Sequence, residues 1–196
     1  MKLVLASASP RRAEILRNAA ITFETQIALV DESILPGELP GEYVRRLALE
    51  KARAAAEARH DRNENLFVGA DTTVVMANEI LGKPESEEDA RRMLRLLSGA
   101  THEVHTGLAI LSPRDKIERV VEEITRVSFA PLSEDEIDAY IATGEPFDKA
   151  GGYGIQGIAG RYVTRIEGCY FNVMGLPLAR LWSLLRELGW GDSTGA

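Results

Sequence analysis

The feature that most constrains this chain is the alternation of strand and helix patterns along its length. Strand patterns lie near residues 2–6, 22–28, 66–76, 103–111, 117–129 and 162–166. Helix patterns lie near residues 10–20, 41–59, 86–98, 133–144 and 177–189. This order predicts an α/β fold with a twisted sheet flanked by helices, and the expected hairpin at 103–129 makes the sheet mixed. We expect one domain over residues 1–190 and a disordered tail over 191–196.

Composition narrows the class of protein further. With 196 residues, of which 45% are hydrophobic, the chain can bury the core of one large domain. It has no apolar run of about 18 residues, which excludes a membrane-spanning helix, and its first residues lack the layout of a signal peptide. The single cysteine, Cys169, suits a reducing cytosol. These observations predict a cytoplasmic protein that does not bind membranes.

The balance of charges argues against nucleic-acid binding. The 23 Lys and Arg residues are outnumbered by 30 Asp and Glu residues, which gives a net charge of −7. A general binder of nucleic acid needs a basic surface. An acidic chain can still bind a small polyanion through a local basic cleft. The three histidines and the one cysteine form no zinc pattern.

Two arginines follow the first strand at a place where a helix disfavours them. Ser9 suits the N-cap and Pro10 the first helical position, so Arg11 and Arg12 fall in the first turn. The partial positive charge of a helix N-terminus opposes cations there, and a bound phosphate or carboxylate would reverse that cost. We expect removal of either arginine to change the stability of the ligand-free protein little. The alternative is that both point into solvent or pair with Glu14.

Four further charged residues are candidates for the site, and two of them interrupt apolar patterns. Lys51 lies in the apolar stripe of the helix at 41–59, where it either extends its amine outward or meets an anion. Asp71 lies in an otherwise apolar strand, where a carboxylate needs a metal, a cation or several N–H donors. Glu32 could supply a second carboxylate, and oxygen ligands favour Mg²⁺ over Zn²⁺. Lys83 follows the strand in a short Gly-Lys-Pro loop, which fits either a fixed cation or a solvated lysine.

These pieces together resemble the Maf family of nucleoside triphosphate pyrophosphatases, once described as septum-formation inhibitors. The resemblance extends from about residue 3 to 188 and includes Ser7-Ala8-Ser9-Pro10-Arg11-Arg12, Asp31-Glu32-Ser33, Glu50-Lys51-Ala52, Gly69-Ala70-Asp71-Thr72, Gly82-Lys83-Pro84, Leu97-Ser98-Gly99, Asp148-Lys149-Ala150-Gly151-Gly152-Tyr153-Gly154-Ile155-Gln156-Gly157, Glu167-Gly168 and Asn172-Val173-Met174-Gly175-Leu176-Pro177. It implies a fold similar to that of inosine triphosphate pyrophosphatases. It also implies hydrolysis of a nucleoside triphosphate to the monophosphate and pyrophosphate with a divalent metal, Mg²⁺ or Mn²⁺, and a homodimer.

The resemblance also assigns roles to residues of this chain. By the resemblance Asp71 would be the proton acceptor. The residues singled out above have roles compatible with it: Ser7, Arg11, Arg12, Lys51 and Lys83 would bind the substrate, and Glu32 and Asp71 would hold the metal. Whether Asp71 binds metal, water or both stays open.

The string Gly154-Ile155-Gln156-Gly157 is similar to that of the family branch that acts on dTTP and UTP. By the same resemblance Arg11, Thr72 and Gln156 mark specificity. Two alternatives stay open: a 7-methyl-GTP pyrophosphatase of the same family, and a nucleotide-binding regulator of cell division that needs no turnover.

Overall fold

The structure is a computed structural model that describes residues 1–27 and 29–191. Its elements are β1 (Lys2–Ala6), α1 (Pro10–Asn18), β2 (Phe23–Thr25), α2 (Pro40–Glu57), η1 (Arg62–Glu64), β3 (Asn65–Met76), β4 (Glu79–Leu81), α3 (Glu87–Leu97), β5 (Thr101–Ser112), β6 (Ile117–Phe129), α4 (Glu134–Ile141), η2 (Glu145–Asp148), η3 (Ala150–Gly152), η4 (Ile158–Tyr162), β7 (Val163–Glu167), α5 (Tyr170–Val173) and α6 (Leu178–Glu187). The predicted strands and long helices are confirmed, whereas β4 and α5 were not predicted. Ala28 and the tail beyond Gly191 lie outside the described residues.

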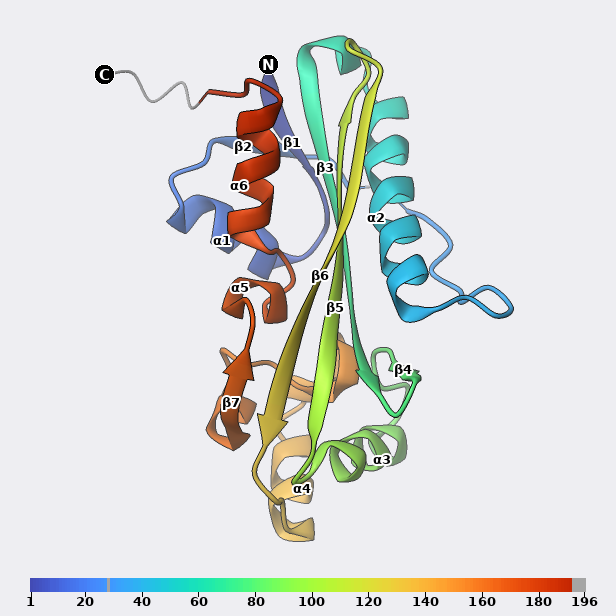
Figure 1. Cartoon of the computed structure of the whole chain (residues 1–196). Coiled ribbons are helices and arrows are strands. Elements are labelled where there is room, and N and C mark those ends of the chain that lie inside the picture. Colours follow the sequence, from blue (N-terminus) through green and yellow to red (C-terminus); the bar gives the residue numbers. More distant parts are fainter. Residues whose placement is uncertain (28, 192–196) are drawn as a thin grey trace. The chain divides into compact units, whose positions relative to one another are not determined.

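The strands of the described residues form one mixed sheet, as the sequence predicted. Its order is β2-β1-β3-β5-β6-β7, and β4 pairs with β3 (Figure 1). Strand β1 runs parallel to both β2 and β3, with Leu3 opposite Phe23 and Leu66. Strand β4 is antiparallel to β3, and β7 is antiparallel to β6. The fold is therefore α/β with a mixed sheet flanked by helices.

The chain divides into two compact units. The first unit comprises residues 1–71, 106–123 and 175–196, and the second comprises residues 72–105 and 124–174. Strands β3, β5 and β6 each contribute residues to both units. Each unit has a hydrophobic cluster of its own.

In the first unit, helix α2 packs closely against the sheet. Its Ala48, Ala52 and Ala55 meet alternate residues of three strands, among them Val4 and Phe67. A Cβ atom at Gly69 of β3 would lie 2.0 Å from the carbonyl oxygen of Ala48, so no other residue fits there without moving the helix. Figure 1 shows α2 on one face of β1 and β3, and α1 and α6 on the other.

In the second unit, capped helices surround an aromatic core. Ser86 caps α3 by accepting a hydrogen bond from the Asp89 N–H, and Ser133 and Glu136 form a capping box at the start of α4. The rings of Phe129 and Tyr153 lie edge to face, with their centroids 4.8 Å apart. The core contains the buried hydrophobic residues Val74, Leu81, Ala90, Met93, Leu94, Leu97, Val104, Val127, Phe129, Ile137, Tyr140, Ile141, Tyr153, Ala159 and Tyr162.

Candidate functional site

The N-terminus of α1 lacks the negative charge that usually compensates a helix dipole. The helix begins at Pro10 with Ser9 as N-cap, as predicted, and its first turn contains Arg11 and Arg12 but no acidic residue. The Ser9 side chain makes no capping hydrogen bond within the described part of the chain; instead, the Ser9 N–H donates to Ser7 Oγ at 3.1 Å. This end of the helix is therefore suited to an anion from outside the chain.

Arg12 has a structural role that the sequence did not reveal. Its side chain is buried, and its Nε donates to the carbonyl oxygen of Gly175 at 2.7 Å while Nη1 donates to Ser7 Oγ at 3.1 Å. Burial lowers the pKa of Arg12, and the nearby carboxylates of Asp71 and Glu32 act in the opposite direction. These contacts argue against the expectation that removal of Arg12 changes stability little, because its guanidinium bonds to the turn before α6.

Lys51 and two carboxylates form the charged centre of the first unit. Lys51 Nζ lies 2.6 Å from Asp71 Oδ1 and 2.6 Å from Glu32 Oε1. Lys51 and Asp71 are each only 8% exposed, whereas the Glu32 side chain is half exposed. Lys51 thus meets anions rather than extending into solvent, which settles the alternative that the sequence left open.

Helix and strand periodicity explain why these side chains meet. Phe67, Gly69 and Asp71 alternate along β3 and so face the same side of the sheet, the side covered by α2. Lys51 follows Ala48 by one helical turn, and Ala48 is the residue that contacts Gly69. The close approach that Gly69 allows therefore places Lys51 directly over Asp71.

The loop that bears Glu32 is tied to α2 by residues that sequence reasoning missed. The Tyr43 hydroxyl donates to the Glu32 carbonyl oxygen at 3.0 Å, and Arg46 Nη2 donates to the Ser33 carbonyl oxygen at 3.0 Å. Burial and the charges of Asp71 and Glu32 raise the pKa of Tyr43 to about 12. The spacing of Arg46 and Glu50 shows an ion pair within the helix, but no sequence signal links Tyr43 or Arg46 to a loop.

The donor set of this centre fits a magnesium ion completed by substrate. Because Glu32 Oε1 and Asp71 Oδ1 both contact one ammonium group, they are no farther apart than twice 2.6 Å. Mg²⁺ commonly takes one or two carboxylates and then substrate phosphates and waters, rather than a cage made only of protein. The described residues contain no group of three or more His, Cys, Asp or Glu side chains able to hold a metal by themselves.

Thr72, Lys83 and Gln156 belong to the second unit. Thr72 is half-buried, whereas Lys83 and Gln156 are exposed. The loop of Lys83 is fixed by its neighbour, because the Gly82 carbonyl oxygen accepts a hydrogen bond from the Gly151 N–H at 2.9 Å.

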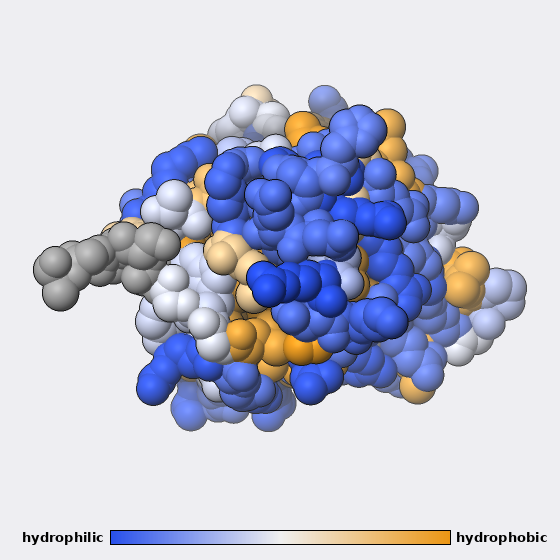
Figure 2. Space-filling view, turned by 90° about the horizontal axis from the view of Figure 1, so that it is seen from above, coloured by the Kyte–Doolittle hydropathy of each residue, from blue (hydrophilic) through white to orange (hydrophobic). Residues whose placement is uncertain are grey.

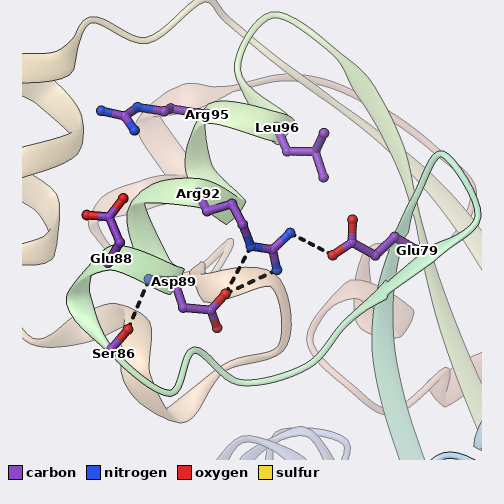
Figure 3. Close-up of a pocket in the computed structure, with 7 residues that line it drawn as sticks. All are labelled: Glu79, Ser86, Glu88, Asp89, Arg92, Arg95 and Leu96. Atoms are coloured by element: carbon purple, nitrogen blue, oxygen red, sulfur yellow. Dashed lines mark hydrogen bonds and ion pairs between the residues drawn. The ribbon is translucent and has the colours of Figure 1, made fainter.

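The second unit also contains a hollow of about 700 Å³ beside α3 (Figure 3). Arg92 contacts Glu79 at 2.6 Å and Asp89 at 3.1 Å, so the charges that line the hollow largely satisfy one another. Its lining residues are Glu79, Ser86, Glu88, Asp89, Arg92, Arg95 and Leu96. None of them belongs to the set that the sequence singled out.

Hydrophilic residues cover most of the face seen in Figure 2, and hydrophobic residues form separate small areas on it. Among the described residues, no helix combines the length and the apolar character needed to cross a bilayer.

Curated relatives match almost the whole chain. The dTTP/UTP pyrophosphatase of Koribacter versatilis (strain Ellin345) is 52% identical over 189 residues, which are 96% of this chain and 95% of the relative. The dTTP/UTP pyrophosphatase of Citrifermentans bemidjiense is 53% identical over 188 residues, which are 95% of both chains.

Solved structures show a likeness of fold at low sequence identity. The Ham1 protein of Staphylococcus aureus matches with a TM-score of 0.54 and 15% identity, covering 96% of this chain and 100% of that one. A HAM1 protein from Coxiella burnetii matches with a TM-score of 0.53 and 17% identity, covering 95% and 99%. A family model described as Maf-like protein matches residues 2–188. Because that model and the relatives extend over nearly the whole chain, the protein belongs to the Maf family.

Proposed function

We propose that this protein hydrolyses dTTP and UTP to the corresponding monophosphate and pyrophosphate. The names of relatives about half identical to it over nearly their whole length support this substrate choice. The observation within the chain that carries the proposal is the buried ion pair of Lys51 and Asp71 at 2.6 Å, with Glu32 on the same ammonium group. A protein that only bound nucleotides would have no need of a carboxylate so placed.

Asp71 is the proposed proton acceptor. The oxygen of a water molecule attacks the α-phosphorus, the bond from this phosphorus to the oxygen bridging to the β-phosphorus breaks, and pyrophosphate leaves with the electron pair. The proton of the water passes to an Asp71 oxygen. General-base catalysis of this kind is typically worth about 10²–10⁴-fold in rate. Lys51 fixes the carboxylate through Oδ1 at 2.6 Å, which orients the acceptor.

The basic residues of the first unit bind the triphosphate in this proposal. Arg11 and the N-terminus of α1, whose first N–H groups have no partner within the helix, supply positive potential. No acidic side chain in the first turn opposes it. Arg12 orients Ser7 through the hydrogen bond to Ser7 Oγ. Lys51 keeps its hydrogen bond to Asp71 and has further N–H donors, which can bond to phosphate oxygens once Glu32 leaves it.

Glu32 and Asp71 would hold a divalent cation, Mg²⁺ or Mn²⁺, together with phosphate oxygens of the substrate. Such an ion supplies stabilisation of the charge that develops on the phosphate oxygens. Glu32 is suited to this role because its side chain is half exposed and can leave Lys51 for a metal.

Recognition of the base is assigned to Gln156, with Arg11 and Thr72 as further specificity residues and Lys83 as a further phosphate-binding cation. A primary amide can donate to a pyrimidine carbonyl and accept from the ring N3–H, so one side chain can bond to both groups of thymine or uracil. This assignment rests on the family resemblance and on the exposure of the Gln156 side chain.

We further propose that the protein acts in the cytoplasm, which agrees with its single cysteine. We also propose that it forms a homodimer, as the family resemblance implies. Light scattering on the purified protein with and without dTTP measures the mass of the particle. A monomer at micromolar concentration in both samples would contradict the proposed assembly.

The decisive experiment is a panel of dTTP, UTP, CTP, GTP and 7-methyl-GTP with Mg²⁺, in which pyrophosphate and monophosphate are both quantified. We expect dTTP and UTP to have the highest kcat/KM. A preference for 7-methyl-GTP would instead identify the protein as a 7-methyl-GTP pyrophosphatase of the same family. Binding without turnover of any triphosphate would favour the regulator.

A matched variant, Gln156→Glu, tests how the base is read. It keeps the side-chain length but removes the donor and adds a charge that repels the carbonyl edge. An unpaired buried polar group costs about 1–3 kcal/mol, so we expect turnover of dTTP and UTP to fall about 10-fold or more relative to residual purine turnover. Equal losses on all substrates would mean that Gln156 does not read the base.

A further inference from the structure

The side chain of Gln156 projects from a tight turn. The Gly157 N–H donates to the Gly154 carbonyl oxygen at 3.0 Å, which places Gln156 at the third position of a four-residue turn. Ile158, the first residue after the turn, begins the short helix η4. The direction of the Gln156 side chain therefore depends on what holds residues 154–158.

Glu145 holds this turn from a distant part of the sequence. Its Oε2 accepts the backbone N–H of Ile158 at 3.0 Å, and its Oε1 accepts the hydroxyl of Tyr140 at 3.1 Å. Tyr140 is 1% exposed and lies in the core of the second unit. The carboxylate of Glu145 thus connects a rigid helix residue to the backbone two residues after Gln156.

Gly157 is shaped to admit this carboxylate. A Cβ atom on Gly157 would lie 2.0 Å from Glu145 Oε1, although the backbone there has φ −97°, a value that any residue adopts. The absence of a side chain at Gly157 is therefore explained by Glu145 and by nothing in the backbone conformation.

A second contact packs the start of the turn. Lys149 Nζ donates to the Glu145 carbonyl oxygen at 2.8 Å, and its Cε would lie 2.7 Å from a Cβ atom on Gly154. Residues 154 and 157 are thus both glycines at points where side chains of the 145–149 segment touch the turn.

We propose that Glu145 is a specificity-determining positioning residue, which fixes the turn of Gln156 so that its amide is held ready to read the pyrimidine edge. This inference rests on the proposed function and deepens it. Glu145 touches no reacting atom in this proposal, so its removal affects how the base is bound and leaves the chemical step at Asp71 unaltered.

The experiment compares Glu145→Ala with the wild type on dTTP and CTP, whose Watson–Crick edges differ at N3 and C4. We expect KM for dTTP to rise about 10-fold and the preference for dTTP over CTP to fall about 10-fold, which corresponds to about 1.4 kcal/mol. The kcat for dTTP should stay within about twofold, a split that general destabilisation would not give. Glu134→Ala is the matched control, because that exposed carboxylate pairs with Arg95, which lies on α3 and outside the turn.

Two double variants test the mechanism. In a Gln156→Ala background, Glu145→Ala should cause no further loss of preference, because Glu145 acts through Gln156. Gly157→Ala should reproduce the loss in the wild type, because its methyl group displaces the carboxylate, and should add nothing once Glu145 is Ala. Losses that add in either cycle, or an unchanged preference in Glu145→Ala, would overturn the inference.

Amide hydrogen exchange separates this inference from the proposed function. In the protein without nucleotide, Glu145→Ala should speed exchange of the Ile158 amide at least 10-fold relative to Glu134→Ala. If the wild type releases no pyrophosphate from any triphosphate, the proposed function and the reading of the base both fall. If the wild type is active and the Ile158 amide exchanges equally in both variants, the positioning role alone is wrong.

Discussion

The two units of this chain bury polar groups in opposite ways. The first unit buries full charges, with Arg12, Lys51 and Asp71 each 8% exposed, and compensates them by ion pairs and hydrogen bonds. The second unit buries neutral groups: His102 Nε2 and the Tyr153 hydroxyl are 2.8 Å apart, and burial lowers the pKa of His102 to about 4. Buried charge is expensive unless it is paired, and the costly arrangement is found where we propose that the triphosphate binds.

The same contrast separates the proposed binding centre of the first unit from the aromatic core of the second. Among the described residues, the Nδ1 atom of His102 is buried without a hydrogen-bond partner, so this ring is not equipped to carry the second proton that would charge it. Its neighbours are the edge-on rings of Phe129 and Tyr153. Lys51, by contrast, lies between two carboxylates.

Replacing Asp71 with Asn should give the largest effect. Asn keeps the size and can still accept a hydrogen bond from Lys51, but it cannot take the proton of the attacking water. We expect kcat for dTTP to fall about 10³–10⁴-fold, the upper part of the range for a general base. Circular dichroism and thermal melting check that the variant folds. A folded variant with wild-type turnover would make Asp71 structural.

Replacing Lys51 with Met should destabilise the first unit, because it leaves Asp71 buried next to Glu32 without its cation. Removing one partner of a buried pair costs about 3–5 kcal/mol, and the slight exposure of this pair favours the lower end, about 3 kcal/mol. Urea unfolding measures the loss. Adding Asp71→Asn to the same chain should recover most of it, and a double variant as unstable as the single one would show that packing of the lysine stem matters more than charge.

Arg12→Ala and Arg11→Ala should differ in stability although the residues are adjacent. Arg12→Ala removes hydrogen bonds to the Gly175 carbonyl oxygen and Ser7 Oγ, and should cost about 2–3 kcal/mol. Arg11→Ala should change the free energy of unfolding by less than about 0.5 kcal/mol, since removing a cation from a helix N-terminus offsets any lost contact. Equal costs in urea unfolding would refute the structural role of Arg12.

His102 should make stability depend on pH. Its pKa is about 4 in the folded protein and about 6.5 when unfolded, so below pH 6.5 the unfolded state binds the proton more readily. Stability is therefore complete above about pH 6.5 and is lost as the pH falls toward 4, by about 2 kcal/mol at pH 5. The free energy of unfolding of the wild type and of His102→Gln, measured at pH 7.5 and pH 5, gives the contribution of this residue. Identical pH dependences would show that the pKa of His102 is the same in the folded and unfolded chain.

Local patterns predicted much of the fold. The helices that begin after Ser9, Ser86 and Ser133 start where the sequence places them. This succeeded because caps, breakers and hydrophobic periodicity act over a few residues. The short strand β4 and helix α5 were missed, because elements of three and four residues carry too little pattern and depend on their neighbours.

The sequence also identified Lys51 and Asp71 as polar residues in apolar surroundings, which is a local anomaly that reading alone can detect. It could not pair them, because their meeting depends on the contact between Gly69 and Ala48 across a helix and a strand. It likewise could not separate Arg11 from Arg12. Which of the two guanidinium groups turns inward is decided by the Gly175 carbonyl oxygen, 163 positions away along the chain.

The sequence by itself thus determined the fold class, the family and the kinds of residue at the site, because these depend on local pattern and on motifs in a fixed order. The folded chain alone shows that Lys51 bridges Glu32 and Asp71, that Arg12 donates to the Gly175 carbonyl oxygen, and that Glu145 accepts the Ile158 N–H after the turn of Gln156. Each of these depends on atoms far apart in the chain being brought within hydrogen-bond distance. Such contacts are set by packing, and no local pattern records them.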